Sequence, residues 1–216
     1  MVLVAAYLSG PQNASAAVLL NGSFENYDGG QISGNFDFFS ENTATGWTDN
    51  GVGVYWIEDG AYPNILASDG NHMLTLQSYG NLGSISQTFA TAQGQQYEVT
   101  FDHSILSGQG TGPATAQELT LQVSVTGNAS QNYTLTAIAS PPDFRTSPYT
   151  TQSYTFTATG TSATLTFANQ TVYTGDLHFG TTIDNVAIAA VPEPASAIML
   201  TIVSSLIFFY RRRFRD

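Results

Sequence analysis

Short runs in which apolar and polar residues alternate are the feature that most constrains how this chain folds. In Tyr97-Glu98-Val99-Thr100-Phe101 every second residue is apolar, and residues 119–125 repeat the pattern. A period of two puts successive side chains on opposite faces of a β-strand, so that one face is buried and the other meets water. Similar runs, rich in β-branched and aromatic residues, predict further strands at 19–25, 52–57, 72–76, 85–89, 133–135, 154–156, 165–167 and 183–188.

These runs predict an all-β protein. Gly, Asn, Asp and Pro separate them, and residues 18–190 contain no convincing amphipathic helical pattern. About ten short strands joined by turns favour a β-sandwich, in which two sheets face each other. The long connections at 26–45, 104–116 and 139–150 are where we expect functional loops.

Charge and cysteine content exclude several classes of function. The chain has 16 Asp or Glu residues against 5 Arg or Lys, a formal net charge of −11, and no cysteine. Because nucleic acid binding needs clustered Lys and Arg, the acidic body at residues 18–190 is not expected to bind nucleic acid, whereas cations and neutral sugars stay open. The absence of cysteine excludes a disulfide framework, a thiolate zinc site and a cysteine nucleophile.

The N-terminal segment, residues 1–17, has the pattern of a secretory signal peptide. An apolar run precedes Ala14-Ser15-Ala16, whose small residues fit a signal peptidase cleavage site. The basic residues that usually open a signal peptide are missing, so this assignment relies in part on the C-terminal tail.

The tail, residues 191–216, joins three elements in a fixed order. Pro192-Glu193-Pro194 comes first, an apolar run follows over 195–210, and Arg211-Arg212-Arg213 comes after it. As a helix this run measures about 24 Å, which is short of the hydrocarbon core of about 30 Å. Such a run suits a single, temporary transmembrane helix with the arginines on the cytoplasmic side.

This order resembles the PEP-CTERM sorting signal. The resemblance implies export across the inner membrane and processing near Pro-Glu-Pro by an exosortase, a membrane enzyme similar to a cysteine transpeptidase. It also implies anchoring in the inner membrane during sorting and a final location at the cell surface or outside the cell. PEP-CTERM proteins are associated with exopolysaccharide and biofilm.

Glu25 and Asp184 are the candidate metal ligands. Glu25 ends the predicted first strand and Asp184 lies in the predicted last strand, and these two strands can run side by side in a sandwich. A calcium ion, which prefers carboxylate and carbonyl oxygens, would then tie the chain ends together; otherwise both carboxylates face water. The histidines His72, His103 and His178 match no zinc spacing.

Tyr55, Trp56 and Tyr27 are the candidate sugar-binding residues, because aromatic faces stack on sugar rings. Adjacent residues of a strand point to opposite faces, so one of Tyr55 and Trp56 is expected to be exposed. The chain has no nucleophile elbow, phosphate-binding loop or zinc-protease motif. We therefore do not expect an enzyme.

The body also resembles galactose-binding-like jelly rolls. The resemblance is carried by Asn21-Gly22-Ser23-Phe24-Glu25, Gly46-Trp47, 94–101 and 183–188, in that order. This group includes many carbohydrate-binding modules and a family of uncharacterised domains shared with plant cell-wall proteins. It implies a jelly-roll β-sandwich with a structural calcium ion on the first-strand acid and the last-strand Asp, here Glu25 and Asp184.

Together these features predict an exported, noncatalytic surface or matrix protein of an exopolysaccharide-producing bacterium, with a β-sandwich that binds polysaccharide. A purely structural biofilm or adhesion component without sugar binding is the alternative. A secreted glycan-active enzyme is the third hypothesis.

Overall fold

The computed structural model describes residues 17–27, 36–38, 44–49, 53–61, 64–78, 81–107, 118–136, 145–171 and 180–192. All regular structure in these residues is β-strand, as the alternating runs predict. The strands are β1 (Phe36–Phe38), β2 (Thr48–Asp49), β3 (Tyr55–Glu58), β4 (His72–Thr75), β5 (Gln77–Ser78), β6 (Asn81–Leu82), β7 (Ser84–Ala90), β8 (Gln96–Ser107), β9 (Glu118–Val125), β10 (Gln131–Thr136), β11 (Arg145–Thr146), β12 (Thr150–Thr157), β13 (Ser162–Asn169) and β14 (Gly180–Ala190).

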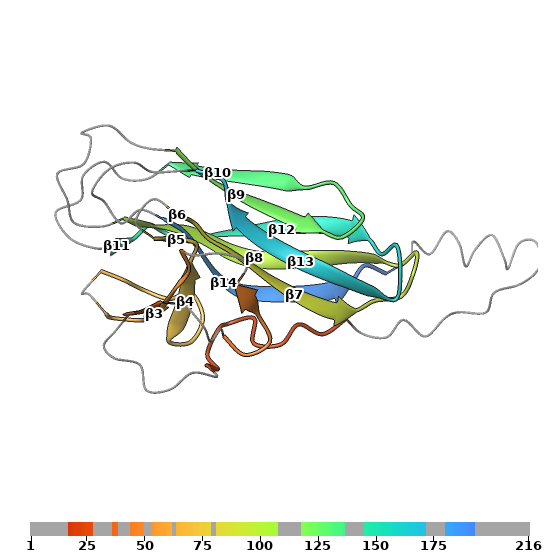
Figure 1. Ribbon diagram of the computed structural model, residues 1–216, viewed down its shortest axis with the longest axis horizontal. Helices are drawn as coiled ribbons and strands as arrows, with labels where there is room; N and C mark the ends of the chain where they lie inside the picture. Colours follow the sequence, from red (N-terminus) through yellow and green to blue (C-terminus); the bar gives the residue numbers. More distant parts are fainter. Residues whose placement is uncertain are drawn as a thin grey trace, which may run out of the picture.

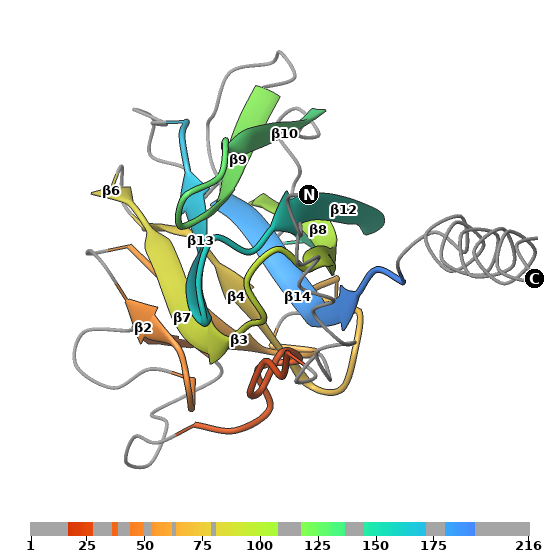
Figure 2. The same cartoon turned by 90° about the vertical axis from the view of Figure 1, so that its right-hand side faces the viewer.

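The strands form two antiparallel sheets (Figure 1). The larger sheet has seven strands in the order β1-β3-β4-β14-β8-β11, and β12 also pairs with β8. The other sheet has five strands in the order β10-β9-β13-β7-β2, and β5 and β6 form a two-stranded ribbon. The two sheets face each other as separate layers (Figure 2). The described part of the chain is therefore a β-sandwich.

The main core lies between the two sheets. Every second side chain of β9 and β13 is buried, so that Leu121 and Phe167 point inward. Val99 and Phe101 of β8 belong to the same core and come from the larger sheet. The rings of Phe101 and Phe167 meet edge to face, with their centroids 5.0 Å apart. The alternation in the sequence thus produces the burial of apolar surface that holds the layers together.

β8 is buried on both faces along its second half, residues 101–107. The outer face of the larger sheet carries a second apolar cluster, made of Tyr55, Ile57, Ile65, Met73 and Leu106. The chain before β4 covers this cluster and is joined to β11: Thr146 N–H donates to Asn64 O, and Leu66 N–H donates to Thr146 Oγ1. This covering segment buries the middle of the sheet on its outer side.

Residues 19–25, predicted as the first strand, do not form a strand. Asn21 and Phe24 have φ values of 52° and 57°, which interrupt an extended backbone. The side chain of Asn21 closes a turn, because its Oδ1 accepts from Asn26 N–H (2.9 Å) and its Nδ2 donates to Asn26 O (2.7 Å). Hydropathy does not report these backbone angles, so the prediction of a strand here was wrong.

The predicted signal peptide lies almost entirely outside the described residues, and the predicted transmembrane helix lies entirely outside them. Of the predicted signal peptide at 1–17, the structure describes Ala17 alone. The predicted transmembrane helix at 195–210 and Arg211-Arg212-Arg213 lie beyond the last described residue, Pro192. Among the residues that the structure describes, no helix is long and apolar enough to cross a membrane.

Gly22 lies against the backbone of β14 at a distance that only glycine permits. Val186 N–H donates to Gly22 O at 2.9 Å, and a Cβ on Gly22 would collide with Val186 O. We expect Gly22→Ala to lower the free energy of unfolding by about 1–3 kcal/mol, measured by denaturant titration. Gly160→Ala is the matched control, because the nearest atom to its Cβ would be 3.9 Å away. Equal stability of the two variants would contradict the close approach.

Candidate functional site

Glu25 binds the backbone at the start of β4. Its Oε1 accepts from the N–H groups of Asn71 (2.8 Å) and His72 (2.7 Å), and its Oε2 lies 3.0 Å from His72 Nδ1. The His72 ring stacks on Trp56 with centroids 3.7 Å apart and planes at 12°. Gly70 leaves room for the carboxylate, because a Cβ there would lie 2.5 Å from Glu25 Oε1. Backbone N–H groups and a packed ring therefore fix the position of Glu25.

Asp184 lies at a β-bulge in β14 and is fully buried. Its Oδ2 accepts from Ser68 N–H (2.8 Å), from the Ser68 hydroxyl (3.1 Å) and from Asp69 N–H (3.0 Å). Its Oδ1 accepts from Asn185 N–H at 2.7 Å. Asn185 has a φ of 49°, and its Nδ2 donates to Asp102 Oδ2 at 3.1 Å. The bulge thus places two carboxylates side by side in β14 and β8.

Burial raises the pKa of Asp184 to about 6, because removal from water disfavours the charged carboxylate. The hydrogen bonds from Asp69, Asn185 and Ser68 act in the opposite direction and stabilise the carboxylate. In this site, the cost of desolvation outweighs the gain from hydrogen bonding.

Glu25 and Asp184 therefore bind the two ends of one segment, Ser68–His72. We call the two side chains and the backbone of this segment the carboxylate clamp. Hydrogen bonds to an ionised acceptor are stronger than neutral ones, so the clamp joins three remote parts of the chain firmly. These parts are the turn at residues 21–26, which we call the N-terminal turn, the chain before β4, and β14.

A calcium ion at the clamp stays a prediction. Among the described residues, no three His, Cys, Asp or Glu side chains form a group that could hold a metal ion. Two carboxylates are suitable ligands for calcium, and backbone carbonyl oxygens would have to complete the coordination.

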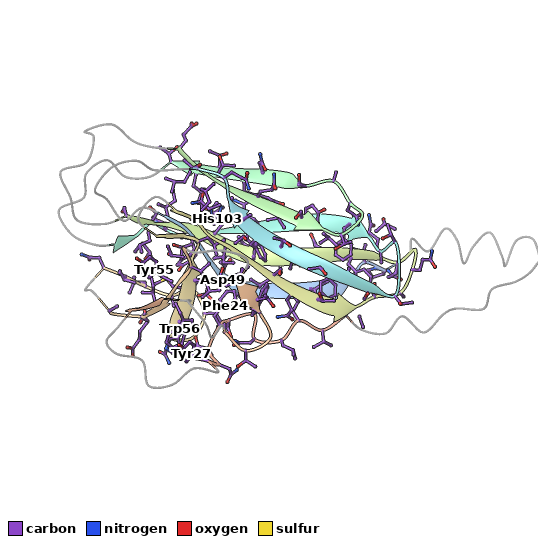
Figure 3. The ribbon with its side chains drawn as sticks, viewed as in Figure 1. Phe24, Tyr27, Asp49, Tyr55, Trp56 and His103 are labelled. Carbon is purple, nitrogen blue, oxygen red and sulfur yellow. The ribbon has the colours of Figure 1, made fainter. Side chains whose placement is uncertain are left out.

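Two of the three aromatic candidates for sugar binding are buried. Trp56 is 3% exposed in the main core, and Tyr55, on the opposite face of β3, is 8% exposed in the outer cluster. Trp56 Nε1 donates to Phe24 O at 2.7 Å. Tyr27 is partly buried and stacks on Trp56 with centroids 5.3 Å apart (Figure 3). Neither Tyr55 nor Trp56 offers the open ring face that stacking on a sugar requires.

A surface that the sequence did not single out covers the outside of the five-stranded sheet. Its outward side chains are mostly hydroxyls and amides. We call it the hydroxyl face, and it consists of Ser84, Ser86, Thr88, Thr120, Gln122, Ser124, Asn132, Thr134, Thr136, Thr164 and Thr166. Along the described strands of this face, Glu118 at the start of β9 is the one charged outward residue.

Neighbouring strands of the hydroxyl face are linked through their side chains. Thr88 and Thr164 share a hydrogen bond of 2.8 Å between β7 and β13. Thr120 and Thr134 share one of 3.0 Å between β9 and β10. These pairs hold the hydroxyls in a regular array whose spacing is set by the strands, about 4.8 Å apart.

The family model described as "Protein of unknown function (DUF642)" matches residues 17–189. The chain belongs to the DUF642 family. The match begins at Ala17, which is buried in the main core, and ends within β14, so that the DUF642 domain and the β-sandwich coincide. No curated protein matches this DUF642 chain.

Several solved structures resemble this DUF642 domain. A cyclase from Fischerella sp. TAU, in complex with 4-(1H-indol-3-yl)butan-2-one, is 16% identical with a TM-score of 0.51, and the match covers 83% of this chain and 99% of that one. A module of the CBM4 class is 13% identical with a TM-score of 0.34, and the match covers 81% of this chain and 100% of that one. The xylan-binding domain CBM22-1 from Paenibacillus barcinonensis is 16% identical with a TM-score of 0.38, over 76% of this chain and 100% of that one.

At these identities the likeness to the cyclase shows the fold alone. The TM-scores of the two carbohydrate-binding modules are too low to carry an argument about this DUF642 chain.

Calcium binding at the carboxylate clamp is testable by thermal unfolding. We expect calcium at a hundred times its dissociation constant to stabilise the protein by about 2.7 kcal/mol relative to a chelator. Asp184→Asn should abolish this difference, because it removes one of the two carboxylates. Glu58→Gln is the control, since Glu58 is an exposed acid outside the clamp. A wild-type midpoint that calcium leaves unchanged would rule out the ion.

Proposed function

We propose that this protein is an exported, noncatalytic carbohydrate-binding protein of a bacterial cell surface or extracellular matrix. The hydroxyl face is the observation that carries the binding part of this proposal. It extends over four neighbouring strands of one sheet, β7, β13, β9 and β10, and its side chains are uncharged except for Glu118. A surface of this kind suits an extended, neutral polysaccharide.

The chemistry of the hydroxyl face matches that of a neutral sugar. A Ser or Thr hydroxyl donates one hydrogen bond and can accept two, and an Asn or Gln amide also does both. Pairs such as Thr88 and Thr164 therefore keep capacity for a ligand after bonding to each other. The chain has a net charge of −11, but this face has almost no carboxylates. A neutral ligand can therefore bind it without the free-energy cost of removing water from unpaired charges.

The end of the domain supports the sorting part of the proposal. β14 ends at Ala190, and Val191 is still fixed, because its N–H donates to Gln96 O (2.9 Å) and its O accepts from Gln95 Nε2 (2.8 Å). The next residue, Pro192, is exposed. The last described strand thus ends two residues before Pro192, the first residue of the motif on which an exosortase would act.

Charges on the hydroxyl face should weaken polysaccharide binding. We expect Gln122→Glu together with Thr164→Glu to reduce the affinity at least about tenfold, which corresponds to about 1.4 kcal/mol, because each new carboxylate would lose water against a neutral ligand. Affinity electrophoresis through gels containing neutral exopolysaccharides, with a glycan array, measures the effect.

The matched control carries the same added charge elsewhere. Ser153→Glu together with Thr157→Glu places two carboxylates at exposed positions of β12, in the other sheet. If both double variants bind like wild type, the hydroxyl face is not the binding surface. If the wild-type protein binds no glycan at all, the purely structural role is favoured instead.

Processing of the tail is tested by mass spectrometry of the mature protein from the cell surface. We expect a C-terminus near Pro192-Glu193-Pro194 and loss of residues 195–216. A variant with Pro192→Ala and Pro194→Ala should keep the tail and stay in the membrane fraction. A wild-type surface protein that still ends at Asp216 would argue against removal of the tail.

A further inference from the structure

Three side chains in the described part of the chain have buried polar atoms without a hydrogen-bond partner. These atoms are both ring nitrogens of His103, Oγ of Ser147 and Oγ1 of Thr181. His103 and Thr181 are fully buried. Buried polar groups are nearly always paired, and an unpaired one lowers stability. Three such side chains in a small domain therefore need a physical explanation.

The register of the larger sheet brings the three side chains together around Ile105 of β8. Thr181 of β14 is the Cα partner of Ile105, and Ile183 is that of His103. Ser147 N–H donates to Ile105 O at 2.9 Å, which places Ser147 opposite Ile105 on the other side of β8. His103 is two residues from Ile105 and shares its face. His103 is a diagonal neighbour of both Thr181 and Ser147, at about 7–8 Å. Thr181 and Ser147 flank Ile105 and are two strand spacings apart, about 9.6 Å, a span that one sugar residue with hydrogen bonds at both ends can bridge.

The cluster is on the inner face of the sheet and has apolar surroundings. Phe101 and Ile183, which share its face, belong to the main core. The neighbouring carboxylates, Asp102 and Asp184, alternate with these residues and therefore point to the outer face. His103, labelled in Figure 3, is fully buried. No charge from these strands balances a charged ligand here.

The three side chains can both donate and accept hydrogen bonds. Burial lowers the pKa of His103 to about 4, so its ring is neutral at ordinary pH and offers one donor and one acceptor. The hydroxyls of Ser147 and Thr181 each donate once and accept twice. A partner that satisfies all three must carry adjacent donors and acceptors and no net charge. Neighbouring hydroxyl groups have this chemistry.

We propose that His103, Ser147 and Thr181 form an internal binding site for a small uncharged polyol, such as a single sugar residue. Ser147 as a whole is half-buried, although its Oγ is shielded from water. The site is near the end of the sandwich at which β8 stops at Ser107 and β14 starts at Gly180. This site is separate from the hydroxyl face and does not depend on the proposed function.

The first test uses the stability of the ligand-free protein. Thr181→Val replaces an unpaired hydroxyl by a methyl group of the same shape, so we expect the midpoint of thermal unfolding to rise by about 2–4 °C. Thr182→Val is the matched control at the next position. The Thr182 hydroxyl is paired with Thr75 Oγ1 (2.7 Å) and Leu106 N–H (3.1 Å), so this substitution should lower the midpoint.

The second test uses binding by the full-length protein. We expect at least one of D-glucose, D-galactose, D-xylose and glycerol to shift the ring ¹⁵N signals of His103 while those of His72 stay unchanged. Thr181→Val and Ser147→Ala should each remove this shift, and Gln122→Glu on the hydroxyl face should retain it. A Thr181→Val midpoint that falls as in Thr182→Val, or His103 signals that no probe changes, would overturn the proposal.

Discussion

The pairing of β8 with β14 is the interaction on which the rest of the structure depends. The two strands are paired from Gly180 with Leu106 to Ala190 with Tyr97, across one bulge. The inner face of the pair carries core side chains, and its outer face carries Asp184, which binds the chain before β4. The bulge at Asn185 lets the N-terminal turn approach, because Val186 N–H reaches Gly22 O. Core, clamp and N-terminal turn are therefore all built on one strand pair.

The sequence predicted those strands that have one buried face and one solvent-exposed face. Residues 97–101 and 119–125 alternate because the two-sheet core removes every second side chain from water. The extension of β8 to Ser107 could not be predicted in this way. From Phe101 onward both faces are covered, and buried polar residues find their partners in remote segments: Asp102 accepts from Thr151 and Asn185, and Ser104 donates to Ser147.

The candidate site shows a similar division. The sequence suggested that a first strand ending at Glu25 can run beside the last strand. The structure has a turn there instead, and Gly22 of this segment accepts a hydrogen bond from Val186 N–H of β14. The sequence could not show that both carboxylates bind Ser68–His72, because nearly every residue has a backbone N–H group and the residue types do not reveal which of these groups donate. It predicted that Tyr55 and Trp56 face opposite ways, but not that both faces of β3 are covered. The hydroxyl face was present as alternate polar positions, and only the register shows that they adjoin.

The place of β14 in the chain has a consequence for how the domain is completed. Among the described strands, β14 comes last in sequence but lies between β4 and β8 within the larger sheet. Until residues 180–190 are available, β4 and β8 have no partner at this position, and their edges stay open to other chains. Pairings over such long sequence separations also form slowly. A nascent chain of this protein therefore exposes unpaired strand edges, which can bind other chains, until β14 has been synthesised.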